Sequence, residues 1–139
     1  MTTQKISSKY NGGMDFTHSI SQHEFHTDGS VVDGGKDSAP GPKRLMLSSL
    51  AGCTGIDVVS ILDKMKVDFS DFSIEVEARL TDEHPKIYDK VTVTYHIKLA
   101  EADQAKMQKA VNLSVEKYCG VMAMFKKFAE VDTKIEYLP

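Results

Sequence analysis

The most restrictive feature of this sequence is one apolar segment, LMLSSLAGCTGIDVVSIL, at residues 45–62. At helical spacing its apolar side chains point in every direction. They are Leu45, Met46, Leu47, Leu50, Ala51, Ile56, Val58, Val59, Ile61 and Leu62. A helix that is apolar all round must be enclosed on all sides. Because Asp57 and several small polar residues interrupt it, we expect a buried core helix rather than a membrane span, with Pro42 at its start.

Three later segments alternate between apolar and polar residues with a period of two. They are FSIEVEARL at 72–80, VTVTYHIKL at 91–99 and VDTKIEY at 131–137. This alternation is typical of antiparallel strands with one buried face, and the link DEHPK predicts a turn between the first two. The N-terminal segments 14–20 and 22–29 predict two short strands, with Asp28-Gly29 as a turn signal. A flexible loop rich in glycine and proline follows them.

The C-terminal third predicts two consecutive helices. The first spans about 102–118, and its expected buried face contains Met107, Ala110, Val111, Ser114 and Tyr118. Gly120 interrupts the pattern, and a second apolar stripe contains Val121, Met124, Phe125 and Phe128. The whole chain, 1–139, is therefore expected to form one α+β domain. Because each sheet has only one apolar face, a partner subunit is an easy way to enclose the helix at 45–62.

Composition excludes several classes of protein. The net charge of −3 and the low isoelectric point, about 5.9, argue against a nucleic-acid partner. The N-terminus lacks the apolar core of a signal peptide, and the two cysteines, 66 positions apart, do not suggest a disulfide scaffold. We therefore expect a cytoplasmic protein whose cysteines are normally reduced.

The two cysteines allow two interpretations. Cys53 has open space between Gly52 and Gly55, but the negative charge of Asp57, one turn further on, opposes a second negative charge on its sulfur. Cys119 precedes a helix, where free amides would lower the pKa of its thiol. The alternative is that both are small hydrophobic residues of the core.

At this level the sequence resembles the OsmC/Ohr superfamily of osmotically inducible and organic hydroperoxide resistance proteins. The similarity is carried by GPKRLMLSSLAGCTGIDVVSIL and by the downstream LSVEKYCGVMAMF. It is closest to the branch of small, mostly uncharacterised OsmC-like proteins. The resemblance implies an intertwined homodimer, in which antiparallel sheets from both chains wrap around central buried helices and two sites lie at the interface.

The resemblance also implies thiol peroxidase activity of the kind used in oxidative stress responses. Cys53 would reduce an organic hydroperoxide and become a sulfenic acid, and Cys119 would resolve it as a disulfide. No cofactor or metal is implied, and an external dithiol or small thiol would reduce the disulfide.

One expected feature of these peroxidases is missing. They carry a glutamate nine or ten positions before the first cysteine, paired with an activating arginine, but Arg44 and Lys43 stand at those positions here. Both are candidate activating cations, although nine residues of ideal helix turn through about 900° and place Arg44 opposite Cys53. Arg44 would reach the sulfur if the helix started later or if it served the other subunit. The alternative function is a non-catalytic OsmC-like dimer that binds a small apolar ligand at its interface.

Histidines offer a weaker candidate site. His18, His23 and His26 lie close together in sequence, but His23 and His26 would point to opposite faces of a strand. We therefore expect no metal there. His84 and His96 are expected to be solvated.

Overall fold

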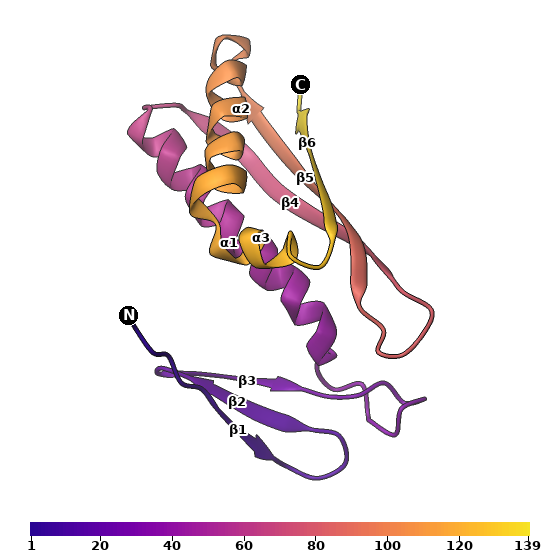
Figure 1. The fold of residues 1–139 in the computed structure, drawn as a ribbon. Coiled ribbons are helices and arrows are strands. Elements are labelled where there is room, and N and C mark those ends of the chain that lie inside the picture. Colours follow the sequence, from indigo (N-terminus) through magenta and orange to yellow (C-terminus); the bar gives the residue numbers. More distant parts are fainter. The chain divides into compact units, whose positions relative to one another are not determined.

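The computed structural model describes all of residues 1–139, and the chain divides into two compact units, Met1–Met46 and Leu47–Pro139 (Figure 1). The first unit is a three-stranded antiparallel sheet in the order β1-β2-β3. Strands β2 (Phe16–Ile20) and β3 (His23–Thr27) were predicted, whereas β1 (Ser7–Tyr10) was not. The turn between β2 and β3 lies at Ser21, which has a positive φ, and Asp28-Gly29 follows β3.

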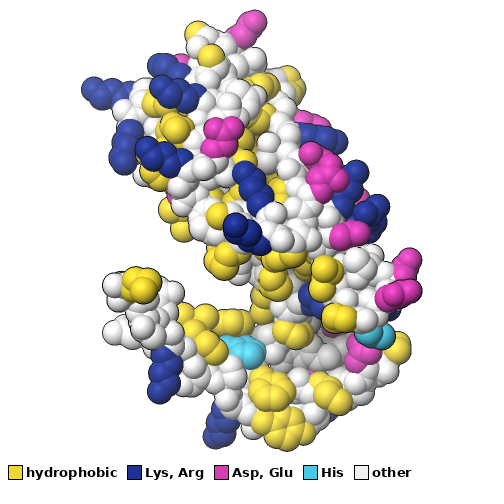
Figure 2. All heavy atoms as spheres, in the orientation of Figure 1, with side chains coloured by type: hydrophobic (Ala, Val, Ile, Leu, Met, Phe, Trp, Pro, Cys, Tyr) yellow, Lys and Arg dark blue, Asp and Glu magenta, His cyan; other side chains and the backbone are white.

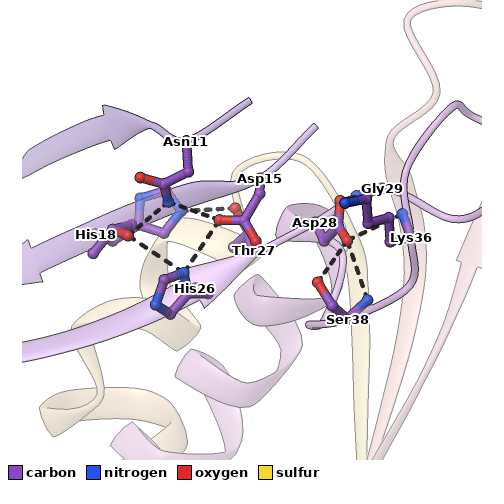
Figure 3. Close-up of polar contacts among 10 residues, drawn as sticks. Asn11, Asp15, His18, His26, Thr27, Asp28, Gly29, Lys36 and Ser38 are labelled. Atoms are coloured by element: carbon purple, nitrogen blue, oxygen red, sulfur yellow. Dashed lines mark hydrogen bonds and ion pairs between the residues drawn. The ribbon is translucent and has the colours of Figure 1, made fainter. Parts of the chain in front are cut away.

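Asp28 organises the glycine-rich loop that follows β3. One carboxylate oxygen, Oδ2, accepts hydrogen bonds from the backbone amides of Lys36 and Ser38 and from the Ser38 hydroxyl (Figure 3). The other oxygen accepts from the amide of Gly29. These bonds, led by the one from the Ser38 hydroxyl, lower the pKa of Asp28 to about 2. The loop has no helix or strand, but a buried carboxylate holds it in one conformation.

Helix α1 (Pro42–Lys64) begins at the predicted proline. Its buried residues recur every four positions and form what we call the buried stripe: Leu50, Thr54, Val58 and Leu62. The single chain does not enclose the rest of α1, since Ile56 is 73% exposed. By length and composition alone α1 is apolar enough to cross a membrane, a property that core helices of soluble proteins share.

The second unit contains a three-stranded sheet in the order β4-β5-β6. Strands β4 (Phe69–Leu80) and β5 (Tyr88–Leu99) form the predicted antiparallel hairpin. Strand β6 (Glu130–Tyr137) pairs with β5 in parallel, so the purely antiparallel sheet expected from the alternation was wrong at this edge. The reason is connectivity: the helices between β5 and β6 form a crossover, which returns the chain in the same direction.

The connection between β5 and β6 contains four helical segments. They are η1 (Glu101–Asp103), α2 (Gln104–Leu113), the π-helix η2 (Ser114–Tyr118) and α3 (Gly120–Phe125). The predicted interruption is confirmed, because Cys119 has an extended backbone between η2 and α3. Two predicted buried faces were partly wrong, because Tyr118, Met124 and Phe128 are exposed in the single chain.

One face of the second sheet packs against helices and forms the core. Alternate residues of β5 are fully buried there: Val91, Val93, Tyr95 and Ile97. They belong to the same hydrophobic cluster as the apolar part of the buried stripe and the buried residues of α2 and α3. Figure 2 shows that many apolar side chains remain at the surface among the lysines and carboxylates. The α+β fold class is thus confirmed, with the core between the sheet and the helices.

Candidate functional site

The structure brings the two cysteines together from positions 66 residues apart. Cys53 lies in the middle of α1 and is half-buried, whereas Cys119 lies between η2 and α3 and is only 3% exposed. Both are free thiols, and the Cys53 side chain is close enough to Cys119 to raise the pKa of the Cys119 thiol. The contact satisfies the first requirement for a reversible disulfide, which is close approach of the two sulfurs.

Local sequence explains this placement. A Cβ atom on Gly55 would lie 3.2 Å from Cδ1 of Ile74, so the glycine allows α1 to approach β4 closely. On the other side, the amide of Cys119 donates to the carbonyl of Ser114 at 2.8 Å. The Cys119 sulfur in turn accepts a hydrogen bond from the amide of Met122 at 3.3 Å. Each cysteine is therefore held by its own backbone segment.

The thiol of Cys119 retains its proton at neutral pH. Burial and the hydrogen bond to Cys53 raise its pKa to about 11, and the negative charge of Asp57 acts in the same direction. The predicted lowering of this pKa at a helix start was wrong. The amide of Met122 does lower it, but one such bond is outweighed by burial and by the neighbouring sulfur. The pair is therefore asymmetric, with Cys119 as the proton-bearing member.

A chain of buried hydrogen bonds lies beside the two thiols. The hydroxyl of Thr54, the residue after Cys53, lies 2.7 Å from the hydroxyl of Tyr95 and 2.8 Å from that of Ser114. Ser114 donates to a carboxylate oxygen of Asp57 at 2.9 Å. Thr54, Tyr95 and Ser114 are fully buried.

The direction of this chain follows from the number of donors. Each hydroxyl has a single hydrogen, and that of Ser114 is directed to Asp57. Thr54 must therefore donate to Ser114, and Tyr95 must donate to Thr54. Burial raises the pKa of the Tyr95 hydroxyl, which keeps this donor protonated. The result is a chain of hydrogen bonds in which every donor points the same way, from Tyr95 on β5 to Thr54 on α1, then to Ser114 on η2 and back to Asp57 on α1.

Sequence reasoning found only part of this arrangement. It noted Asp57 as a charge near Cys53 and placed Ser114 on a buried helix face, but it did not connect them. Thr54 and Tyr95 were missed altogether. A signal was present: Thr54 and Asp57 are three residues apart on one face of an otherwise apolar helix, and buried hydroxyls need partners.

The two candidate cations lie near the start of α1. Arg44 and Lys43 are exposed in the first turn of α1, in the unit Met1–Met46, and neither forms an ion pair. A pocket of about 340 Å³ opens on the second unit next to Asp57. It is lined by Asp57, Ser60, Ile61, Lys64, Met65, Leu113 and Tyr118.

The N-terminal histidines form hydrogen bonds within their own sheet. The two ring nitrogens of His18 lie 2.7 Å from the hydroxyls of Ser8 and Thr27, and His26 contacts Asp15 at 3.1 Å (Figure 3). No group of three or more metal-ligating side chains lies close enough to hold a metal ion.

The expectation that His96 is solvated was wrong. Its side chain is only 21% exposed and lies between Glu75 and Glu136 of the neighbouring strands. Its Nε2 atom is buried and has no hydrogen-bond partner.

Comparisons with known proteins agree on one family. Residues 35–134 match the family described as OsmC-like protein. The sequence is 31% identical over 118 residues to Protein YhfA of Escherichia coli K12, with 85% of each chain covered.

Solved structures have the same fold. A hypothetical protein from Aquifex aeolicus VF5 gives a TM-score of 0.85 at 27% identity, with 99% of this chain and 98% of that one covered. An organic hydroperoxide resistance protein OsmC from Legionella pneumophila gives 0.69 at 17% identity, with 98% of each covered. The region that matches the family, residues 35–134, contains both cysteines. Because it covers most of the sequence, this chain belongs to the OsmC family.

Proposed function

We propose that this protein is a thiol-dependent redox enzyme that reduces organic hydroperoxides through Cys53 and Cys119. The observation that carries the proposal is the contact between two free thiols with unequal roles, one half-exposed and one buried with its proton retained. The name of the Legionella relative, an organic hydroperoxide resistance protein and predicted redox protein, points to the same chemistry.

The reaction has two chemical steps in which atoms and electrons balance. The Cys53 thiolate attacks the distal peroxide oxygen, the O–O bond breaks, and the alkoxide takes up a proton and leaves as an alcohol. Cys53 is now a sulfenic acid. The Cys119 sulfur then attacks the Cys53 sulfur, the S–S bond forms, and hydroxide leaves with the Cys119 proton as water. An external dithiol or small thiol reduces the disulfide by two exchange steps.

A homodimer is part of this proposal. In the single chain α1 leaves Ile56 and Met46 exposed, and Tyr118 and Met124 are exposed near Cys119. Apolar side chains of this size on a central helix are typical of a surface that a second subunit covers.

The test is single-turnover thiol loss. Reduced protein is mixed with one equivalent of cumene hydroperoxide, and free thiols and intact mass are followed over time. We expect rapid loss of both thiols in the unmodified protein. The Cys119→Ser variant should stop at a sulfenic acid, and the Cys53→Ser variant should not react. Thiol loss no faster than that of free cysteine would exclude the peroxidase.

A second candidate is a non-catalytic dimer that binds a small apolar ligand at its interface. Two observations favour it: Arg44 and Lys43 form no ion pair, and the glutamate that would pair with an activating arginine is absent from positions 43 and 44. This candidate predicts an unreactive Cys53 together with saturable binding of an apolar fluorescent probe to the dimer.

A further inference from the structure

Ser114 connects the two segments that carry the cysteines. Its hydroxyl bonds to Thr54 and Asp57, which stand one and four residues after Cys53 on α1. Its carbonyl accepts the amide hydrogen of Cys119 at 2.8 Å. One fully buried residue is thus bonded to the Cys53 helix through its side chain and to Cys119 through its backbone.

The π-helix η2 makes this connection possible. The bond between Ser114 and Cys119 spans five residues, whereas a regular α-helix would bring the amide of Tyr118 to the same carbonyl. Successive side chains of a helix point in directions that differ by about 100°. One extra residue in the turn therefore decides which side chain is directed into the core after Ser114. Here the wider turn puts Cys119 inside, while Tyr118 is exposed.

Buried polar atoms hold this register. If Ser114 moved along the helix by one position, the Thr54 hydroxyl would lose its acceptor and the Asp57 carboxylate would lose its donor. Leaving such groups unsatisfied in a buried site is unfavourable. The bonds therefore specify the position of Ser114, and the π turn then specifies the position of Cys119.

We propose that Ser114, anchored by Asp57, is a positioning residue that sets the approach of Cys119 to Cys53 and thereby speeds formation of their disulfide. A disulfide tolerates only about 4.4–6.8 Å between Cα atoms, so small displacements of one segment slow the step in which the S–S bond forms and water leaves. The peroxide-dependent part of this proposal rests on the proposed function. The geometric part does not, because any oxidant or disulfide must bring the same two sulfurs together.

The first experiment needs no peroxide. It measures the effective concentration of the Cys119 thiol relative to the Cys53 thiol. Each protein is equilibrated with glutathione redox buffers, and the fraction of Cys53–Cys119 disulfide is measured by mass spectrometry. We expect Ser114→Ala and Asp57→Ala to lower the effective concentration by about tenfold or more. Asp57→Asn keeps an oxygen acceptor for Ser114 and should stay close to the unmodified protein. Gln108→Ala, which removes an exposed bond to Asn112 on α2, is the matched control.

The second experiment divides the peroxide reaction into its two steps. With one equivalent of cumene hydroperoxide, Ser114→Ala should slow disulfide formation more than it slows sulfenic acid formation, so that dimedone traps more of the sulfenic acid. If no variant reacts with peroxide, the proposed function fails, and the glutathione measurement still decides the role of Ser114.

Two results would overturn the inference. One is an effective concentration in Ser114→Ala equal to that of the unmodified protein. The other is a loss in Asp57→Asn as large as in Asp57→Ala, because then the charge and not the bond to Ser114 matters. Asp57 is only half-buried, so its two variants keep the test valid even if Ser114→Ala does not fold.

Discussion

The bond between Thr54 and Tyr95 allows a quantitative prediction about stability. In Thr54→Val, a methyl group replaces the hydroxyl that accepts the Tyr95 hydrogen at 2.7 Å. A fully buried donor is then left without a partner, and the free energy of unfolding should fall by about 2 kcal/mol. In Tyr95→Phe, the Thr54 hydroxyl keeps its bond to Ser114, so the loss should be smaller, about 1 kcal/mol. In the double variant no donor is orphaned, and the total loss should be about 2 kcal/mol, about 1 less than the sum.

Urea unfolding at one fixed protein concentration measures these differences, since the proposed dimer would make stability depend on concentration. The slopes of the four transitions must agree for the comparison to hold. Losses that add to within about 0.4 kcal/mol would refute the shared bond and with it the directed chain that ends at Asp57.

Three further predictions concern other parts of the molecule. Hydrogen bonds to the Asp28 carboxylate lower its pKa from 3.8 to about 2. The contribution of these bonds to stability should therefore be present above pH 3.8 and be lost as pH falls toward 2, and amide hydrogen exchange at Ser38 measures this loss. In Cys53→Ala, the Cys119 thiol loses a hydrogen-bond acceptor and a charged neighbour, so its pKa should fall below about 11 in an ultraviolet titration of the thiolate. Ile56→Lys should put a charge on the exposed face of α1 and reduce the mass seen by light scattering to that of one chain, 15.4 kDa.

The sequence allowed good prediction where a local pattern determines the structure. Pro42 begins α1 as expected, because proline at the first helical position lacks only an amide that would be unpaired anyway. The period-two alternation located β4, β5 and β6, since each has one buried face. The pairing of Cys53 with Cys119 was available only from the family resemblance, because spacing alone allowed both to be ordinary core residues.

The rest depended on contacts between distant segments. The direction of β6 relative to β5 is set by the crossover between them and not by the alternation within either strand. The pKa of Cys119 was predicted in the wrong direction, because a helix start is visible in sequence whereas burial against Cys53 is not. The chain from Tyr95 to Asp57 joins three elements, and its partners are 41, 60 and 57 residues apart.

The position of Cys53 on α1 leads to a last prediction about its activating cation. Gly52 and Ile56 share the exposed face of the helix, and a Cβ atom on Gly52 would meet nothing within 4 Å. Cys53 lies between this face and the buried stripe, so a second subunit that covered the exposed face would approach the sulfur from that side. The cation is then expected to come from Arg44 or Lys43 of the partner subunit. Within its own helix Arg44 points to the side opposite Cys53, and Lys43 lies ten residues, about 15 Å, along the axis.

Complementation between two variants tests this arrangement. Arg44→Ala chains, which keep Cys53, are mixed with Cys53→Ser chains, which keep Arg44, and the dimers are allowed to exchange. If the cation crosses the interface, the mixed dimer contains one complete site, and iodoacetamide should alkylate its Cys53 faster than in the pure Arg44→Ala protein. The same test is repeated with Lys43→Ala. An unchanged alkylation rate in both mixtures would mean that neither residue acts across the interface, because the mixed dimer supplies every other part of the site.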